Sequence, residues 1–165
     1  MDAEEQAVYA ALIQAMFPAK MVVLMNTTAT GVAGNDNTDQ TLQYVLKNMH
    51  AVSTQTTDSF KARNASAGPL HGDMQLGVPY ALLSQDEVTS IFSMNQDGWQ
   101  VFYERYPDAR GILTFSRVGF DAALDQALVY VGNQNQALAG SGHYLLLKKV
   151  DGAWIIDQKV MTWIS

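Results

Sequence analysis

His143 is the residue of this chain best suited to acid–base chemistry. It follows Gly140-Ser141-Gly142 at the expected start of a strand, and an imidazole titrates near neutral pH, as a general base must. In that role it needs a carboxylate such as Glu104 or Asp157 to orient its ring. The hairpin register derived below places Val160 opposite His143, which favours a packing role at a sheet edge.

Ser116, His143 and the aspartates of the chain have the residue types of a hydrolytic triad. A nucleophilic serine is typically presented at a sharp turn within a Gly-x-Ser-x-Gly sequence, whereas Ser116 lies in a strand pattern. We therefore expect its hydroxyl to be bonded to backbone. No catalytic residue is predicted, and His143, Glu104 and Asp157 remain the alternative set.

Metal ligands are sparse. The chain has no cysteine, and His71-Gly72-Asp73 offers two ligands where a structural zinc site needs four. His50 ends a helix, where the helix dipole favours a cation. The loop containing Asp36 and Asp39 lacks the calcium-loop pattern. The sequence predicts no metal and no cofactor.

Arg117 and Glu104 are charged residues within apolar stretches. Buried charges must be paired, so we expect these two to pair with each other, or Arg117 to pair with Asp121. An arginine in a pocket can instead bind a carboxylate or phosphate group of a ligand. Arg117 is therefore also a candidate binding residue.

Aromatic residues recur at helical spacing at Trp99, Phe102, Tyr103 and Tyr106. We expect one side of this run in the core and its tyrosines at a pocket or a partner surface. The candidate binding residues are Arg117, Tyr103, Tyr106 and Tyr144.

Composition bounds the class of protein. The 165 residues fit a single domain, 1–165, with 48% apolar residues and only 16% charged residues. A formal net charge of -6 argues against nucleic-acid binding, which depends on neutralising phosphates. No apolar run approaches the roughly 20 residues that span a bilayer. Residues 1–5 run directly into a helix pattern, so a mature exported domain and a cytoplasmic protein are both open.

Local signals predict the elements before residue 111. Asp2 and Glu5 have capping-box spacing for a helix over 3–16, and residues 21–25 read as a buried strand. A polar loop over 27–37 precedes a helix over about 39–50. A short helix is expected near 57–60, and a capping box at 84–87 begins another helix that Asp97-Gly98 breaks.

Residues 111–165 read as four successive strands. Asp151-Gly152 between two apolar runs predicts a two-residue hairpin turn, which pairs Lys149 with Trp154, Leu147 with Ile156 and His143 with Val160. Several strands are apolar on both sides, so helices or loops should cover both faces. The expected fold is α+β, with N-terminal helices packed on a four- to five-stranded curved antiparallel sheet of cystatin-like or NTF2-like architecture.

The C-terminal two-thirds of the chain resembles a group of small uncharacterised bacterial proteins. The resemblance rests on Asp58–Asn64, Trp99, Phe102, Tyr106-Pro107, Gly111, Ser116–Phe120, Ala127–Val131, Gly140–Gly142, Leu146-Leu147, Lys149, Gly152–Trp154 and Trp163–Ser165. It implies that such proteins are often exported and attaches no activity to them.

These features together predict a non-enzymatic binding or interaction module for a protein or a small-molecule ligand. The alternative is a small NTF2-like cavity enzyme that acts on a small molecule with His143 as general base. An enzyme would need a partly polar pocket that contains His143 and a carboxylate, whereas a protein-binding module would need an exposed apolar patch.

Overall fold

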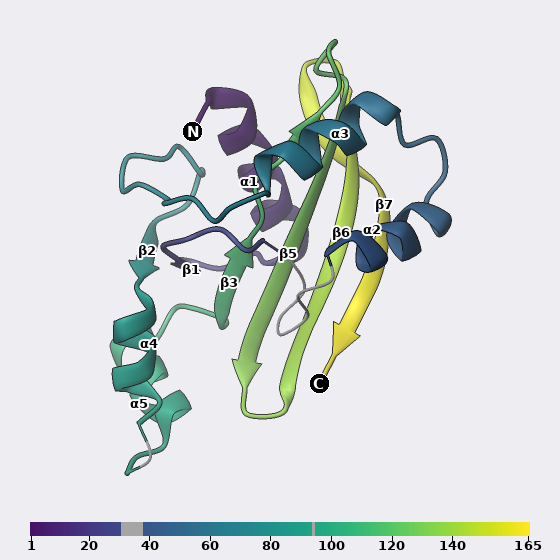
Figure 1. Cartoon of the computed structure of the whole chain (residues 1–165). Helices are drawn as coiled ribbons and strands as arrows, with labels where there is room; N and C mark the ends of the chain where they lie inside the picture. Colours follow the sequence, from purple (N-terminus) through teal and green to yellow (C-terminus); the bar gives the residue numbers. More distant parts are fainter. Residues whose placement is uncertain (31–37, 94) are drawn as a thin grey trace.

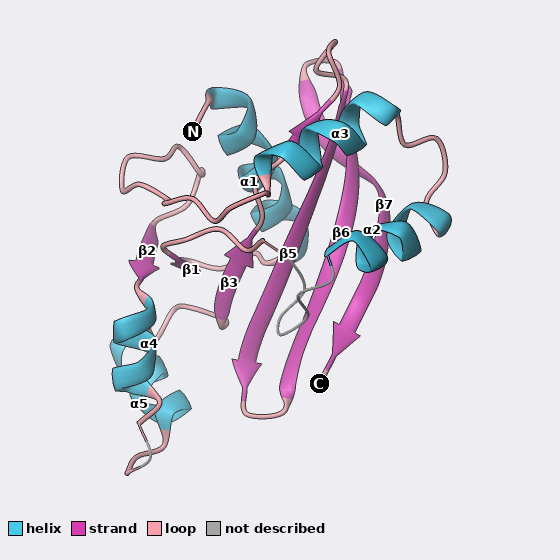
Figure 2. Ribbon diagram, in the orientation of Figure 1, coloured by secondary structure: helices cyan, strands magenta, loops and turns pink. Residues whose placement is uncertain are grey.

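One open sheet carries the helices of this protein on both of its faces (Figures 1 and 2). The computed structural model describes residues 1–30, 38–93 and 95–165. The helices within these residues are α1 (Ala3–Met16), α2 (Thr38–Lys47), α3 (Thr54–Arg63), α4 (Gln85–Ile91) and α5 (Gly98–Arg105). The strands are β1 (Val22–Met25), β2 (Tyr80–Leu83), β3 (Ile112–Phe115), β4 (Gly119–Phe120), β5 (Gln126–Gln136), β6 (Ala139–Val150) and β7 (Ala153–Ile164).

The described strands form a seven-stranded sheet in the order β2-β1-β3-β5-β6-β7, with β4 paired to β5. The C-terminal strands are antiparallel, as expected, and the α+β class is confirmed. The C-terminal strands β3 to β7 agree with the expected four to five. β1 pairs in parallel with both β2 and β3, and these short strands extend the sheet beyond the C-terminal meander.

Both faces of the central strands are buried. Val129 and Leu145 pack against α1, whereas Leu128 and Leu146 pack on the opposite face against α2 and α3. Figure 2 shows α2 and α3 crossing the front of β5 and β6 and α1 behind the sheet. A third cluster joins β1 and β2 to α4 and α5. This double cover explains why the strand sequences are apolar on both sides.

Capping groups define the helix starts. The Asp2 side chain accepts from the Glu5 backbone N–H at 2.8 Å, and α1 spans the predicted residues 3–16. Ser84 and Glu87 form the predicted capping box of α4. The predicted helix over 39–50 ends earlier, at Lys47, and the short helix expected near 57–60 extends to ten residues as α3 because Ser53 caps it. The predicted loop over 27–37 lies largely outside the described residues.

The β6–β7 hairpin confirms the predicted turn, with Asp151 and Gly152 both at positive φ, 50° and 80°. Leu147 pairs with Ile156 as predicted. The prediction that His143 faces Val160 is wrong by one residue, because a β-bulge between Leu146 and Leu147 shifts the register, and His143 pairs with Met161. A hydrophobic pattern carries no signal for such a bulge.

Gly152→Val should lower the free energy of unfolding by more than about 1 kcal/mol, since a β-branched residue at positive φ is strained. Space is not the cause, because a Cβ at Gly152 would meet no atom within 4 Å. Gly72 is the matched control, as it is equally open and lies outside the left-handed region. Chemical denaturation should show a small effect for Gly72→Val, and equal losses for the two variants would contradict the strain argument.

Candidate functional site

A cleft of about 810 Å³ lies where α4 and α5 approach the front face of the sheet. Its lining comes from the end of β1 and the residues after it, from β3, from the C-terminal end of β5, and from both helices. Phe92 and Trp99 form its helical side, and Thr114 and Gln134 belong to its strand side. A volume of this size is in the range of small-molecule sites.

The described lining of the cleft is polar but almost uncharged. Its polar side chains are glutamine amides and hydroxyls, with no lysine, arginine or histidine among the described lining residues. Asp97 is the one acidic side chain among them, and its Oδ1 accepts from the backbone N–H groups of Trp99 and Gln100 at 3.1 and 3.2 Å. Asp97 is thus the N-cap of α5.

Several polar side chains of the cleft have unused hydrogen-bonding capacity. Thr114, Gln134 and Gln136 make no side-chain hydrogen bond to any other described residue, and neither does the indole N–H of Trp99. Thr28, in contrast, is committed, because its hydroxyl accepts from the Gly68 N–H at 2.9 Å. Donors and acceptors that are held in a concave site without protein partners are suited to a ligand.

A smaller hollow of about 140 Å³ continues from the cleft across the sheet. The two share Thr114 and Gln134, and the hollow adds Tyr130, Gly132 and Trp163. The candidate site therefore extends from Trp99 on α5 to Trp163 on β7.

His143 lies outside this site. It pairs with Val131 on β5 and Met161 on β7, so it faces the opposite side of the sheet from Tyr130, the neighbour of Val131. Partial burial lowers its pKa, and the charge of Lys159 lowers it further.

The proposed carboxylate partners of His143 are engaged elsewhere. Glu104 Oε1 accepts from the Gln100 amide at 3.1 Å, and Asp157 lies 3.5 Å from the Lys148 ammonium. His143 makes no side-chain hydrogen bond or ion pair within the described residues. The structure therefore does not assemble the alternative catalytic set.

Ser116 has the expected backbone role. Its hydroxyl donates to the Arg117 carbonyl at 2.9 Å and accepts from the Tyr130 N–H at 2.8 Å. The residue is 2% exposed, so the hydroxyl is both committed and inaccessible.

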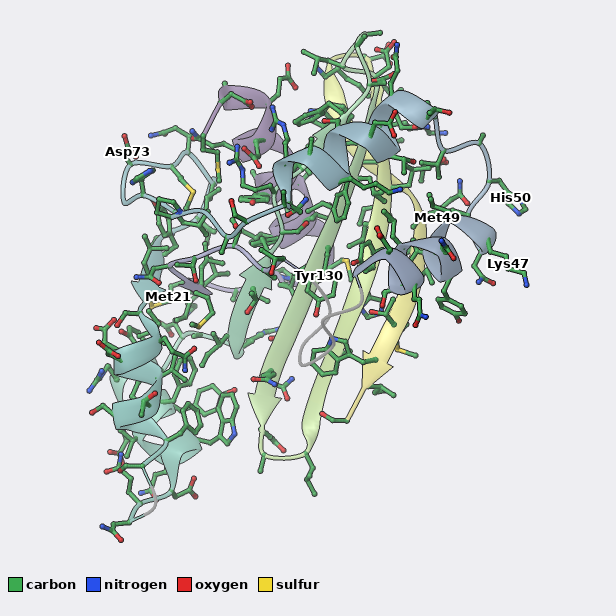
Figure 3. The ribbon with its side chains drawn as sticks, viewed as in Figure 1. Met21, Lys47, Met49, His50, Asp73 and Tyr130 are labelled. Atoms are coloured by element: carbon green, nitrogen blue, oxygen red, sulfur yellow. The ribbon has the colours of Figure 1, made fainter. Side chains whose placement is uncertain are left out.

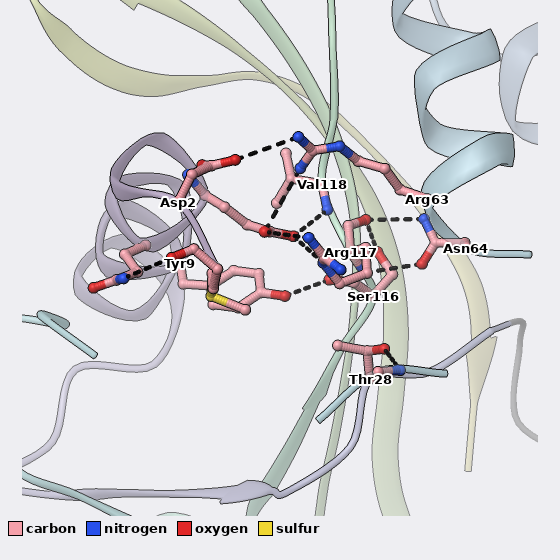
Figure 4. Close-up of polar contacts among 12 residues, drawn as sticks. Asp2, Tyr9, Thr28, Arg63, Asn64, Ser116, Arg117 and Val118 are labelled. Atoms are coloured by element: carbon pink, nitrogen blue, oxygen red, sulfur yellow. Dashed lines mark hydrogen bonds and ion pairs between the residues drawn. The ribbon is translucent and has the colours of Figure 1, made fainter. Parts of the chain in front are cut away.

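Arg117 pairs with Glu5, and both predicted partners, Glu104 and Asp121, are wrong (Figure 4). Glu5 is fully buried, and its two oxygens accept from Arg117 Nε and Nη2 at 2.7 and 3.0 Å. The Val118 N–H adds a bond of 2.9 Å, and Arg63 Nη1 lies 3.6 Å away. The hydrogen bond to Glu5 raises the pKa of Arg117. The Arg117 guanidinium therefore holds α1 to the β3–β4 connection, and its role as a ligand-binding residue stays a prediction.

The candidate tyrosines also serve the core. Tyr144 is 1% exposed and packs between the rings of Phe60 and Tyr130. Tyr103 donates to the Asn135 carbonyl at 2.7 Å and stacks on Trp99. Tyr106 packs on Phe102. In the aromatic run only Trp99 lines the cleft.

The possible metal ligands are dispersed. His50, after α2, and Asp73, in the loop before β2, lie on opposite sides of the molecule in Figure 3. No group of three or more histidine and acidic side chains in the described residues could hold a metal ion. Asp39 is exposed on α2, and Asp36 lies outside the described residues.

Thr114, Gln134, Gln136 and Trp163 were missed in the sequence. Threonine and glutamine on strands resemble ordinary solvent-facing residues, and their only signal is the polar alternation at the end of β5. In the sequence, Trp163 has the pattern of an ordinary hydrophobic residue of the last strand.

Comparison with known proteins finds no matching family model, no matching curated protein and no matching solved structure. Over the described part of the chain, no helix has the length and apolar character needed to cross a bilayer.

Arg117→Ala should cost about 3 kcal/mol of unfolding free energy, because it leaves the buried Glu5 carboxylate without its closest partner. Arg110→Ala is the matched control, since Arg110 is exposed and forms no ion pair with a described residue. The double variant Glu5→Leu/Arg117→Met should lose less than Arg117→Ala alone, because it removes both charges. A loss below about 1 kcal/mol for Arg117→Ala, measured by denaturant unfolding, would contradict this role.

His143 should make the protein less stable as the pH falls below about 6.5. Its pKa is lower in the folded protein than in the unfolded chain, so the unfolded chain binds the proton more readily. Stability is retained above the unfolded pKa and is lost as the pH falls through the folded pKa. His143→Gln should flatten the unfolding free energy between pH 7.5 and 5 relative to the wild type, as measured by denaturant unfolding at each pH, and an unchanged slope would contradict this role.

Proposed function

We propose that this protein is a non-enzymatic binding module that holds a small neutral molecule in the cleft between α4, α5 and the front face of the sheet. The observation that carries the proposal is a cleft of about 810 Å³ whose Thr114, Gln134 and Gln136 side chains have no described protein partner. A ligand would use these groups and bury the apolar surface of Trp99.

Charge in the cleft favours a neutral ligand. A phosphate or carboxylate ligand is usually held by arginine, lysine or a histidine cation, and the described lining provides none of these side chains. Among the described lining side chains, a cationic ligand would meet one carboxylate, that of Asp97, whose oxygen already caps α5.

Binding without a chemical step is favoured over the cavity-enzyme alternative. General acid–base chemistry needs a titratable group within hydrogen-bond reach of the substrate. His143 faces the other side of the sheet, and Asp97 is the only titratable side chain among the described lining residues.

A protein partner has less support. The exposed large apolar side chains of the described residues include Tyr44 on α2, Leu138 in the β5–β6 turn, and Ile155, Met161 and Ile164 on β7. Single exposed apolar side chains are normal for a protein surface, and none of these lines the cleft. Export, which the sequence resemblance implies, remains a prediction, with a cytoplasmic location as its alternative.

The test is a ligand screen against the ¹⁵N-labelled protein with separate pools of neutral, anionic and cationic metabolites. A neutral compound should bind and shift the backbone signals of Thr114 and Gln134 together with the Trp99 indole signal. Binding that leaves these three signals unmoved, or binding by the charged pools alone, would overturn the proposal.

Thr114→Val should weaken the compound that binds about fivefold, because loss of one hydrogen bond costs about 1 kcal/mol. Thr57→Val is the control, since Thr57 is also a half-buried threonine and lies on α3, outside the described lining of the cleft. Calorimetric titration measures both variants, and equal affinities for the two would show that the Thr114 hydroxyl does not contact the ligand.

A further inference from the structure

The Trp163 side chain packs against three glycines of neighbouring strands. The residue pairs with Gly142 across β6 and β7, and its indole ring lies against Gly132, Gly140 and Gly142. A Cβ at Gly142 would overlap the indole nitrogen, and a Cβ at Gly140 would come within 3.1 Å of ring atom Cζ3. The ring can lie against these strands only because Gly140 and Gly142 have no side chain, whereas a Cβ at Gly132 would be 3.6 Å from the ring, an ordinary contact distance.

The orientation of the ring is also fixed by a hydrogen bond. Its indole N–H donates to the Tyr130 hydroxyl at 2.7 Å, and Tyr130 is 3% exposed in the core under α2 and α3. The ring is therefore held both by the strands beneath it and by a buried partner at its edge. An aromatic surface that is fixed before binding loses little conformational freedom when a ligand arrives.

This arrangement adds little to the core. Trp163 belongs to none of the hydrophobic clusters of described residues and makes no ring contact with another described aromatic side chain. The other two tryptophans differ, since Trp154 is buried against α1 and Trp99 packs on Phe92 and Phe102. Glycine within a strand weakens the sheet. Packing in the core therefore does not account for a half-buried tryptophan that lies against strand glycines.

We infer that Trp163 is a preformed stacking platform of the cleft and that the ligand is a neutral saccharide. This inference rests on the proposed function. The hollow over Trp163 shares Thr114 and Gln134 with the larger cleft, so one ligand can contact the ring and these polar groups together.

The chemistry of a sugar ring matches both parts of the site. Its C–H face is apolar and packs on the face of an indole, and its hydroxyl groups both donate and accept hydrogen bonds. Thr114, Gln134 and Gln136 supply neutral donors and acceptors along the cleft. A purely apolar ligand would bury these groups without partners, which is costly. A phosphorylated ligand would find no cationic side chain among the described lining residues.

The test uses maltotriose, cellotriose and chitotriose as probes of different linkage, each titrated to 10 mM. At least one should bind and shift the Trp163 indole signal together with the backbone signals of Thr114 and Gln134. Trp154 is an internal control, because its indole N–H is bound to Glu4 at 2.8 Å and lies away from the cleft.

Variants separate stacking from stability. Trp163→Ala should weaken the trisaccharide that binds at least tenfold, whereas Trp163→Phe should retain part of the affinity and Thr57→Val, on α3 outside the described cleft lining, should leave it within twofold. Gly142→Ala should also weaken binding, because the added methyl group displaces the ring. If Trp163→Ala fails to fold, the Trp163→Phe and Gly142→Ala titrations decide the matter, and unchanged affinity in both would overturn the inference.

The remaining outcomes distinguish this inference from the proposed function. If none of the three probes binds while a neutral compound of another class shifts Thr114 and Gln134, the saccharide inference is wrong and the proposed function stands. If a probe binds and leaves Thr114, Gln134 and Trp163 unmoved, both fail.

Discussion

The buried carboxylate of Glu5 is the interaction on which the arrangement of the helices depends. A charge that is removed from water is costly unless it is paired and fully hydrogen-bonded. Glu5 meets this condition only where α1, the β3–β4 connection and the end of α3 come together, since Arg117, the Val118 N–H and Arg63 belong to the last two. Asn64 locks the same junction, because its side chain accepts from the Arg117 N–H and donates to the Arg117 carbonyl (Figure 4).

That junction also sets where the described helices lie on the front face of the sheet. α3 approaches β4 so closely that a Cβ at Gly119 would lie 2.5 Å from the Phe60 nitrogen. α3 is thereby held over the end of the sheet that contains β4. α2, which precedes α3 in the chain, lies across β6 and β7 (Figure 1). The other end of the front face carries Thr114, Gly132 and Gln134, which line the candidate site. The same packing that stabilises the fold therefore places α2 and α3 away from the described lining of the candidate site.

The bulges of the last strand, β7, affect both the edge of the sheet and the position of the Trp163 ring. β7 lies at the edge of the sheet, where an unprotected row of backbone groups invites pairing with another chain. Two bulges interrupt its register with β6, and the charged side chains of Asp157 and Lys159 lie along it. Bulges and charges are common protections of an edge strand. The second bulge comes just before the pairing of Gly142 with Trp163, so it also helps to place the ring over the glycines.

Features set by neighbouring residues could be predicted from the sequence. The capping groups Asp2 and Ser84 act on N–H groups three residues away, and the Asp151-Gly152 turn depends on two positive φ angles. The antiparallel hairpin, the first helix and the α+β class follow from such local rules. Ala127, Val129 and Val131 lie on one face of β5 and Leu128 and Tyr130 on the other, which depends only on the two-residue period of a strand.

Contacts between distant residues were decided by the tertiary structure. Glu5 and Arg117 are 112 residues apart, and nothing in either local sequence selects this pair over Glu104 or Asp121. The parallel pairing of β2 with β1 and the one-residue bulge opposite Leu147 are likewise invisible in a hydrophobic pattern. The cleft is the clearest case, because Thr114, Gln134 and Trp163 look like ordinary strand residues until the sheet brings them together. Local hydrogen bonds and steric limits on the backbone act within a few residues, whereas the partner of a buried charge and the shape of a cleft depend on how whole elements pack.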